Sequence, residues 1–301
     1  MGKMNRREFL KAGLAGVAGL SLGGKALANM RPDEWHSVNG VFLDKVKLGN
    51  TGLVVPRLAM GTGTVGTNKS SNQTRKGMDF FVKMALHAYE RGMRYYDMAD
   101  MYGSHQYVAQ ALKKVPRENV ILQSKLWTYA DGTDRVQPVR EDIDRFRLEI
   151  GTDYIDILLM HCIMDGKWPQ NRTHYMEGFA RAKEDGIVKT IGLSCHSLDA
   201  LAAAVDNPWV DVILARLNPF QTIMDGTPEV VNELLGKAKA NGKGIIGMKI
   251  FGEGKHITAT EREQSLAYAV KQSNLDCMTV GMESEAQIDD AVNRVMRLVK
   301  S

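Results

Sequence analysis

The chain has 301 residues, enough for one α/β barrel or for two ordinary domains. Its formal net charge is +4, but residues 1–28 hold five basic side chains and one acidic side chain, which leaves 34 of each sign in the rest. A neutral remainder argues against nucleic acid as a partner. Three cysteines without a Cys-x-x-Cys spacing exclude a full disulfide framework and a cysteine-ligated zinc or iron–sulfur cluster of the usual spacing.

The first 28 residues follow a charged, then apolar, then small-residue pattern. Residues 5–11 read Asn-Arg-Arg-Glu-Phe-Leu-Lys, residues 12–24 are Gly-rich and mildly apolar, and residues 26–28 are Ala-Leu-Ala. The segment resembles a twin-arginine export signal. The resemblance predicts a signal peptide over residues 1–28, the twin-arginine export machinery as a partner, and a periplasmic or otherwise exported protein. A membrane anchor is the alternative, but the apolar run is shorter than the ~20 residues that a span needs.

The remaining chain alternates between strand and helix patterns. Residues 29–40 form an N-terminal segment, and residues 41–58 predict a β-hairpin around a Gly-Asn-Thr-Gly turn. Short apolar runs then predict eight strands, at residues 57–60, 94–98, 120–124, 155–160, 188–193, 212–217, 244–248 and 277–280. Amphipathic stretches predict eight helices, at residues 78–91, 106–112, 139–149, 175–184, 198–205, 228–240, 259–271 and 285–299.

Eight strands that alternate with eight helices predict an α/β fold with a parallel sheet. Because eight is the number that closes, we expect residues 41–301 to form a (β/α)8 TIM barrel with the hairpin at its N-terminus. An open doubly wound sheet is the structural alternative.

Four residues of complementary chemistry fall at adjacent strand ends. Asp97 ends the second predicted strand, Tyr102 follows it on a loop, and Lys125 and His161 end the third and fourth. A phenol with a reference pKa of ~10 gives up its proton poorly, and a neighbouring ammonium favours the phenolate. Asp97 would hold the lysine, and His161 would donate to a carbonyl oxygen. The set predicts a proton donor and carbonyl clamp that needs a bound hydride donor.

These residues resemble the tetrad of the aldo-keto reductase family. The pattern Asp-x-Ala-x-x-Tyr-Gly starts at Asp97, and Lys-Leu-Gly-Asn-Thr-Gly-Leu at residues 47–53 resembles the family's entry hairpin. The resemblance covers about residues 41–295. It implies that Tyr102 is the general acid/base, that Lys125 and His161 assist it, that the hydride comes from NADPH or NADH, and that no metal is needed.

The resemblance also implies a set of residues for the cofactor. Ser194 stands in the fifth-strand motif whose serine holds the carboxamide, and Met248 replaces the usual stacking aromatic. Members that use NADP usually place Lys-Ser and a later Arg around the 2′-phosphate, where this chain has Gly281, Met282 and Gln287. Each lost charge-assisted bond is worth ~1.5–3 kcal/mol, so NADP or NAD stays open. The implied cofactor-binding residues are Gly61, Thr62, Asp97, Ser194, Met248, Lys249, Phe251, Gly252, Ser284 and Gln287.

Two glycine-rich segments resemble nucleotide-binding motifs. Residues 61–66 match the Gly-x-Gly-x-x-Gly dinucleotide fingerprint, but a polar loop over residues 67–76 stands where that motif opens a helix. We therefore expect only backbone at Gly61 and Thr62 to approach the cofactor. Residues 252–255 lack the spacing of a phosphate-binding P-loop and are expected to lie along the pyrophosphate.

Residues beside the strand ends are candidates for the substrate pocket. Trp127 and Trp168, in the loops after the third and fourth strands, are predicted to wall it, with rim packing as the alternative. Cys162 follows His161 directly. A Cys-His nucleophile is disfavoured because adjacent strand residues point to opposite faces.

The sequence therefore predicts an exported NAD(P)H-dependent aldo-keto reductase that acts on a small aldehyde or ketone. Its rival is a catalytically weak barrel that binds a ligand or a partner protein, because the cofactor motifs depart from the family's pattern. A cofactor used outside the cytoplasm would have to be loaded before export.

Overall fold

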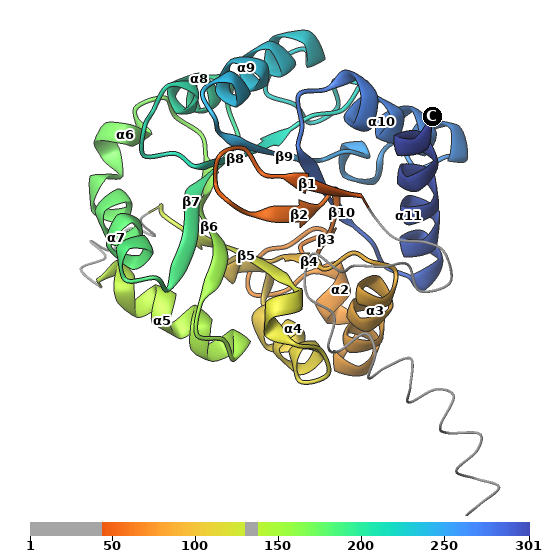
Figure 1. Cartoon of the computed structure of the whole chain (residues 1–301), viewed down its shortest axis with the longest axis horizontal. Coiled ribbons are helices and arrows are strands. Elements are labelled where there is room, and N and C mark those ends of the chain that lie inside the picture. Colours follow the sequence, from red (N-terminus) through yellow and green to blue (C-terminus); the bar gives the residue numbers. More distant parts are fainter. Residues whose placement is uncertain (1–43, 130–137) are drawn as a thin grey trace, which may run out of the picture.

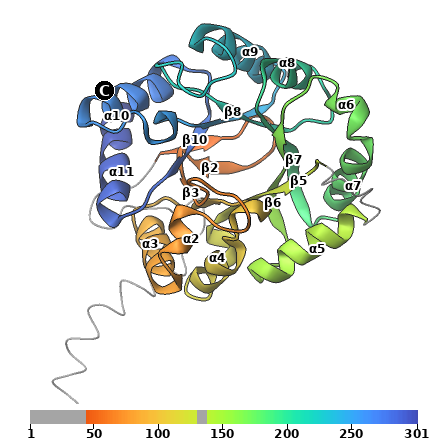
Figure 2. The same cartoon turned by 180° about the vertical axis from the view of Figure 1, so that it is seen from behind.

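A computed structural model describes residues 44–129 and 138–301 (Figure 1). The predicted signal peptide (1–28) and N-terminal segment (29–40) lie outside the described residues, so both stay predictions. The described part is one barrel with helices around it, as the views from the front and from behind both show (Figures 1 and 2).

Eight parallel strands form the wall of a closed barrel in the order β10-β3-β4-β5-β6-β7-β8-β9. Closure confirms the predicted (β/α)8 fold and rejects the open doubly wound sheet. The strands are wholly buried over most of their length because side chains fill the interior and helices cover the outside. They are β3 (Leu58–Gly61), β4 (Tyr95–Asp97), β5 (Ile121–Trp127), β6 (Ile155–Ile163), β7 (Val188–Cys195), β8 (Val212–Arg216), β9 (Gly244–Met248) and β10 (Cys277–Gly281).

Amphipathic helices surround the strands, each with its apolar residues three and four apart against the barrel. Two short helices, α2 (Asn72–Arg75) and α6 (Trp168–Asn171), were not predicted. Ser71 caps α2 by accepting a hydrogen bond from the Thr74 amide, so the stretch expected to be only loop contains a helix. The main helices are α3 (Met78–Glu90), α4 (His105–Leu112), α5 (Val139–Ile150), α7 (Thr173–Glu184), α8 (Leu198–Val205), α9 (Pro228–Ala240), α10 (Ala259–Ala267) and α11 (Glu285–Lys300).

The predicted hairpin, β1 (Lys45–Lys47) with β2 (Val54–Pro56), closes the N-terminal end of the barrel (Figure 1). Leu48 is completely buried, and a Cβ added to Gly244 would lie 2.6 Å from the Leu48 Cγ atom. The Asn50 amide donates to the Gly242 carbonyl at 2.8 Å. With this end plugged, the opposite, carboxyl ends of the strands are left to form a site.

We expect Leu48→Ala to lower the free energy of unfolding by about 2–5 kcal/mol, because it leaves a cavity where the Leu48 side chain packs between the hairpin and the barrel. The measurement is urea denaturation followed by circular dichroism. Leu148→Ala is the matched control, since Leu148 is 83% exposed and its loss should change stability by about 0.5 kcal/mol at most. Equal effects of the two substitutions would contradict the plugging role.

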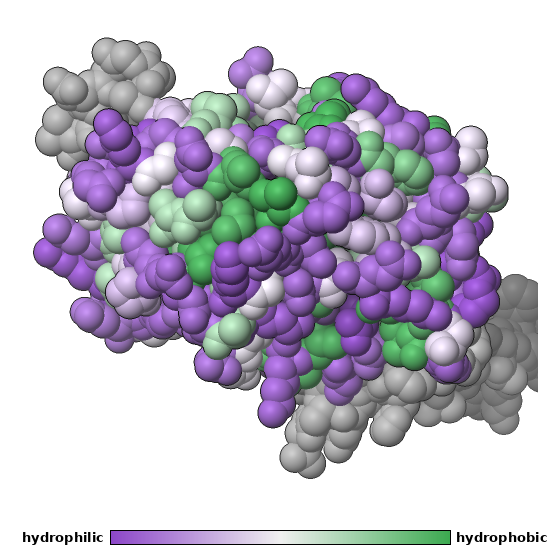
Figure 3. All heavy atoms as spheres, turned by 90° about the horizontal axis from the view of Figure 1, so that it is seen from above, coloured by the Kyte–Doolittle hydropathy of each residue, from purple (hydrophilic) through white to green (hydrophobic). Residues whose placement is uncertain are grey.

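The surface on the side of α8, α9 and α10 is mostly hydrophilic, with apolar side chains gathered in patches between polar ones (Figure 3). Among the described residues, no helix has the length and apolar character needed to cross a membrane.

Candidate active site

A buried ion pair lies at the centre of the strand ends. Lys125 donates to the Asp97 carboxylate, and their side chains are 1% and 7% exposed. Gln123 and Thr279 also donate to Asp97, the latter at 3.0 Å. Lys125 donates further to the Met98 carbonyl at 2.9 Å. Burial lowers the pKa of Lys125, and Asp97 opposes that shift, so the ammonium depends on its partner for its charge.

Tyr102 lies next to this pair, in the 3-10 turn η2 (Asp100–Tyr102) that follows β4. The Lys125 Nζ atom is 4.9 Å from the centre of the phenol ring. Burial raises the pKa of Tyr102 well above its usual value, and the negative charge of Asp97 adds to the rise. The sequence suggested that the lysine would favour the phenolate, but desolvation prevails and the hydroxyl is protonated at neutral pH. A protonated phenol is a proton donor.

His161 faces the Tyr102 hydroxyl, with 3.4 Å between the oxygen and Nε2. Burial lowers the pKa of His161 well below its usual value, and the nearby charge of Lys125 lowers it further, so the imidazole is neutral. The ring of Trp127, at the end of β5, meets the His161 ring edge-to-face at 5.7 Å. The three residues Tyr102, Lys125 and His161 therefore converge as the sequence predicted.

Two glycines hold the phenol ring between them. A Cβ added to Gly63 would lie 2.3 Å from Tyr102 Cε2, and one added to Gly66 would lie 2.4 Å from Cδ1. Neither glycine has a positive φ, so the close approach, and not backbone freedom, requires glycine there. The segment that mimics a dinucleotide fingerprint thus supports Tyr102, a role that its local sequence did not reveal.

Ion pairs fix the turn that carries Tyr102. Asp100 accepts from Lys69 and, at 2.8 Å, from Arg145 Nη1. His105 Nδ1 lies 2.7 Å from a Glu149 oxygen. Asp100, His105 and Glu149 are close enough together to bind a metal ion. Both carboxylates are already engaged, however, Asp100 by Lys69 and Arg145, and Glu149 by Arg145 and the imidazole of His105. The cluster joins the Tyr102 turn to α5.

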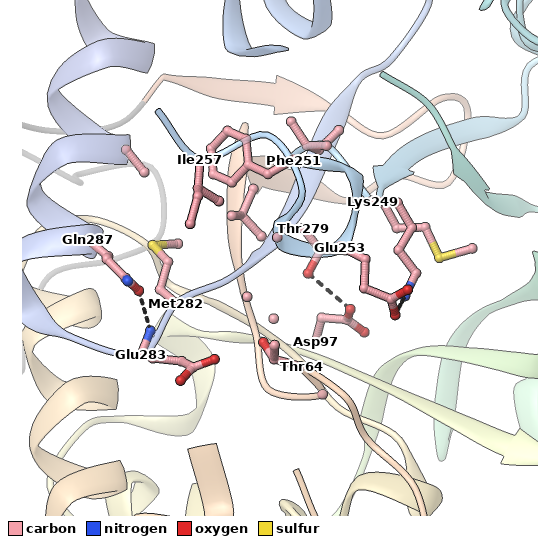
Figure 4. A pocket seen from close by; sticks show the side chains of 18 of the residues that line it. Thr64, Asp97, Lys249, Phe251, Glu253, Ile257, Thr279, Met282, Glu283 and Gln287 are labelled. Atoms are coloured by element: carbon pink, nitrogen blue, oxygen red, sulfur yellow. Dashed lines mark hydrogen bonds and ion pairs between the residues drawn. The ribbon is translucent and has the colours of Figure 1, made fainter. Parts of the chain in front are cut away.

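A cavity of about 610 Å³ opens beside these residues, and its lining includes Tyr102 at one end and Gln287 of α11 at the other. Figure 4 shows the part of its wall from Asp97 and Lys249 to Gln287. Its volume is that of a site for a small molecule or cofactor. Asp97, Tyr102, Lys125 and Met248 line the barrel end, and Gln287 lies at the far end.

The cavity receives six of the ten positions predicted to bind a cofactor, namely Gly61, Asp97, Met248, Lys249, Phe251 and Gln287. The other four, which are Thr62, Ser194, Gly252 and Ser284, do not line it. The Thr62 hydroxyl donates to the Asp97 carbonyl at 2.8 Å, and Ser194 Oγ accepts from the Cys162 amide at 2.7 Å. Ser284 caps α11 by accepting from the Gln287 amide at 3.2 Å. These polar groups serve the packing of the strand ends and loops.

The prediction for Trp168 is wrong. Its side chain is completely buried on α6, donates from Nε1 to the Ala200 carbonyl at 3.2 Å and packs against Trp209. The loop after β6 turns back into the helical layer, so this indole is not part of a pocket wall. Trp127 lies beside His161 but does not line the cavity described above, so its part in a substrate pocket stays a prediction.

Cys162 occupies a bulge at the end of β6. Its φ is +62°, and the pairing of β6 with β7 shifts register between Met160 and Ile163. Burial raises the pKa of the Cys162 thiol, which keeps it protonated. The bulge breaks the alternation of faces assumed from the sequence, but the protonated thiol still argues against a Cys-His nucleophile.

Comparison with known proteins decides the family. The profile described as Aldo/keto reductase family matches residues 57–264. The chain belongs to the aldo/keto reductase family. It is therefore an NAD(P)H-dependent oxidoreductase, as the sequence predicted.

The chain is similar to several named members of the family. It is 25% identical to L-galactose dehydrogenase of Arabidopsis thaliana over 83% of this chain and 88% of that one. It is 27% identical to an NADH-specific methylglyoxal reductase of Escherichia coli over 66% of this chain and 65% of that one. The fold matches that of a Bombyx mori aldo-keto reductase solved with NADP, with a TM-score of 0.63, 20% identity, and coverage of 86% and 93%.

The cavity fits the nicotinamide cofactor that this aldo/keto reductase requires. Met248 is 9% exposed and offers an apolar surface beside Tyr102 and Lys125. Gly61, Gly63 and Gly281 line the cavity with backbone alone, which permits close approach of a ligand.

Gly63→Ala tests the support of the phenol ring. We expect it to lower the free energy of unfolding by about 1–3 kcal/mol, because the new methyl group overlaps the Tyr102 ring. In a Tyr102→Ala background the same substitution should cost much less, and a thermal-denaturation double-mutant cycle measures the difference. Gly226→Ala is the control, since its Cβ would meet nothing closer than 3.4 Å. An equal cost in both backgrounds would show that the ring is not the contact.

Proposed function

We propose that this aldo/keto reductase converts an aldehyde or ketone to an alcohol, or performs the reverse oxidation, with Tyr102 as the proton donor. The supporting observation is the protonated Tyr102 hydroxyl 3.4 Å from the neutral His161 Nε2 and beside the buried Lys125. The reduced nicotinamide, when bound, supplies the hydride that the carbonyl carbon gains.

The protein's own residues handle the oxygen and the proton. His161 orients the substrate oxygen by a hydrogen bond, and the Tyr102 hydroxyl gives its proton to that oxygen as the C=O double bond becomes a C–O single bond. Lys125 stabilises the phenolate that remains, and Asp97 fixes the ammonium in place. Trp127 forms part of the wall beside the imidazole. For oxidation of an alcohol, Tyr102 acts in the opposite direction.

The cofactor is proposed to lie along the cavity, with Met248 beside the nicotinamide and with Lys249 and Phe251 along the following loop. Lys249 pairs with Glu253 at 2.5 Å across this part of the cavity (Figure 4). The methylglyoxal reductase among the relatives points to small aldehydes and dicarbonyls as substrates. Screening NADH and NADPH against a panel of such carbonyls identifies the substrate class.

Tyr102→Phe is the direct test. We expect it to lower the rate of carbonyl reduction by about 10²–10⁴-fold, because the proton donor is lost while the ring is kept. Nucleotide affinity, measured by fluorescence titration, should change little. Full activity in the variant would overturn the assignment of the proton donor, and loss of nucleotide binding would make the phenol structural.

The rival function is a ligand-binding or partner protein with a silent tetrad. Two measurements distinguish the reductase from this rival. Mass spectrometry of the purified protein detects retained nucleotide, and titration with NADH and NADPH then measures whether added nucleotide binds. Absence of retained nucleotide together with failure of both added nucleotides to bind would favour the rival.

The residues before the described barrel support a second proposal, that the protein is exported by the twin-arginine route. Residues 5–11 carry the paired arginines that motivate it. Replacing Arg6 and Arg7 together by lysine should leave the protein in the cytoplasm, because the signal needs the arginine pair and not positive charge alone. Immunoblots of fractionated cells measure this, with Lys3→Arg as a charge-conserving control. An unchanged distribution would contradict the proposal.

A further inference from the structure

We infer that Glu283 makes the cofactor cavity selective for NAD over NADP. The inference rests on the proposed function, because it assumes that the nicotinamide of the cofactor lies at Tyr102. The cavity continues from there to the turn between β10 and α11, where Met282, Glu283 and Gln287 lie together (Figure 4). A dinucleotide with its nicotinamide at Tyr102 must place its adenosine at this other end.

Glu283 is held in place at the adenosine end. The Asn72 Nδ2 atom donates to Glu283 Oε1 at 2.7 Å, and Lys76 Nζ is 3.4 Å from Oε2. The Glu283 amide donates to Gln287 Oε1 at 2.7 Å, so the backbone is fixed as well. The side chain is 28% exposed and belongs to the cavity wall. A fixed carboxylate with unused acceptor positions is therefore present before any ligand binds.

Two cations at this end, Arg262 and Lys76, already have acidic partners. Arg262 lines the cavity, but its Nε donates to Asp290 at 2.8 Å. Lys76 is engaged by Glu283, through its carboxylate and, at 2.8 Å, through its backbone carbonyl. A 2′-phosphate dianion would have to break one of these pairs and would lie against the Glu283 carboxylate.

A ribose with a free 2′-hydroxyl, as in NAD, is attracted rather than repelled by the Glu283 carboxylate. Its 2′-hydroxyl can donate a hydrogen bond to a carboxylate, which is how acidic residues select NAD in another nucleotide-binding fold. A charge-assisted bond of this kind is stronger than a neutral one. Glu283 thus offers an attractive contact to NAD and a repulsive one to NADP, which is how specificity is commonly achieved.

Calorimetric titration of the purified protein with NAD⁺ and NADP⁺, in the absence of any carbonyl, tests the inference. We expect NAD⁺ to bind at least about tenfold tighter. Glu283→Gln should reduce that ratio by about tenfold or more, because the amide removes the repulsion and releases Lys76 for the 2′-phosphate. Adding Lys76→Met to Glu283→Gln should then weaken NADP⁺ again.

Glu285→Gln is the matched control. Glu285 is two residues away, and its carboxylate pairs with Lys83 at 3.1 Å outside the cavity, so the NAD⁺ to NADP⁺ ratio should not change. Equal or tighter binding of NADP⁺ by the unaltered protein would overturn the inference and leave the proposed function standing. An unchanged ratio in Glu283→Gln would overturn it as well. Failure of both nucleotides to bind would overturn the inference and the proposed function together.

Discussion

The ion pair between Asp97 and Lys125 is the interaction on which the site depends. A buried charge is costly unless it is paired and hydrogen-bonded, and removal of one partner of such a pair typically costs about 3–5 kcal/mol. Here the carboxylate also accepts from Gln123 and Thr279, and the ammonium also donates to the Met98 carbonyl. These contacts join β4, β5 and β10. The ion pair that places a positive charge beside Tyr102 therefore also holds together the strands on which its own residues lie.

Desolvation then sets the protonation states around that pair. It moves the pKa of the Tyr102 hydroxyl further above neutral, and it keeps the His161 imidazole uncharged near neutral pH, where an exposed imidazole would be partly charged. A donor phenol, a neutral imidazole and a cation form a consistent set for reducing a carbonyl. The Tyr102 ring is enclosed between Gly63 and Gly66, which leaves no space for water against those parts of the ring.

The two ends of the cavity differ in the charges of the residues around them. The barrel end holds a cation and a proton donor, which suit a carbonyl oxygen that gains negative charge in the reaction. At the α11 end, the carboxylates of Glu283 and Asp290 offset Lys76 and Arg262, which suits a neutral ribose better than a phosphate dianion. The same cavity thus combines the proposed carbonyl chemistry at one end with the inferred preference for NAD at the other.

The barrel, the entry hairpin and the grouping of Asp97, Lys125 and His161 at neighbouring strand ends could be predicted from the sequence, because hydrophobic periodicity and strand ends are local features of the chain. In a closed barrel all carboxyl strand ends share one mouth, so closure placed Asp97, Lys125 and His161 at the same end of the barrel. The leader was predicted from local features as well, and both the leader and its export role stay predictions.

The approach of distant segments to one another is visible only in the folded chain. The contact of Gly63 with Tyr102, the withdrawal of Trp168 into the helical layer and the hold of Asn72 on Glu283 all join residues from different loops or layers. The uncharged state of His161 belongs to the same class, because burial lowers the pKa of its imidazole. No short stretch of sequence carries that information, since each of these properties arises from packing between segments that the chain brings together only on folding.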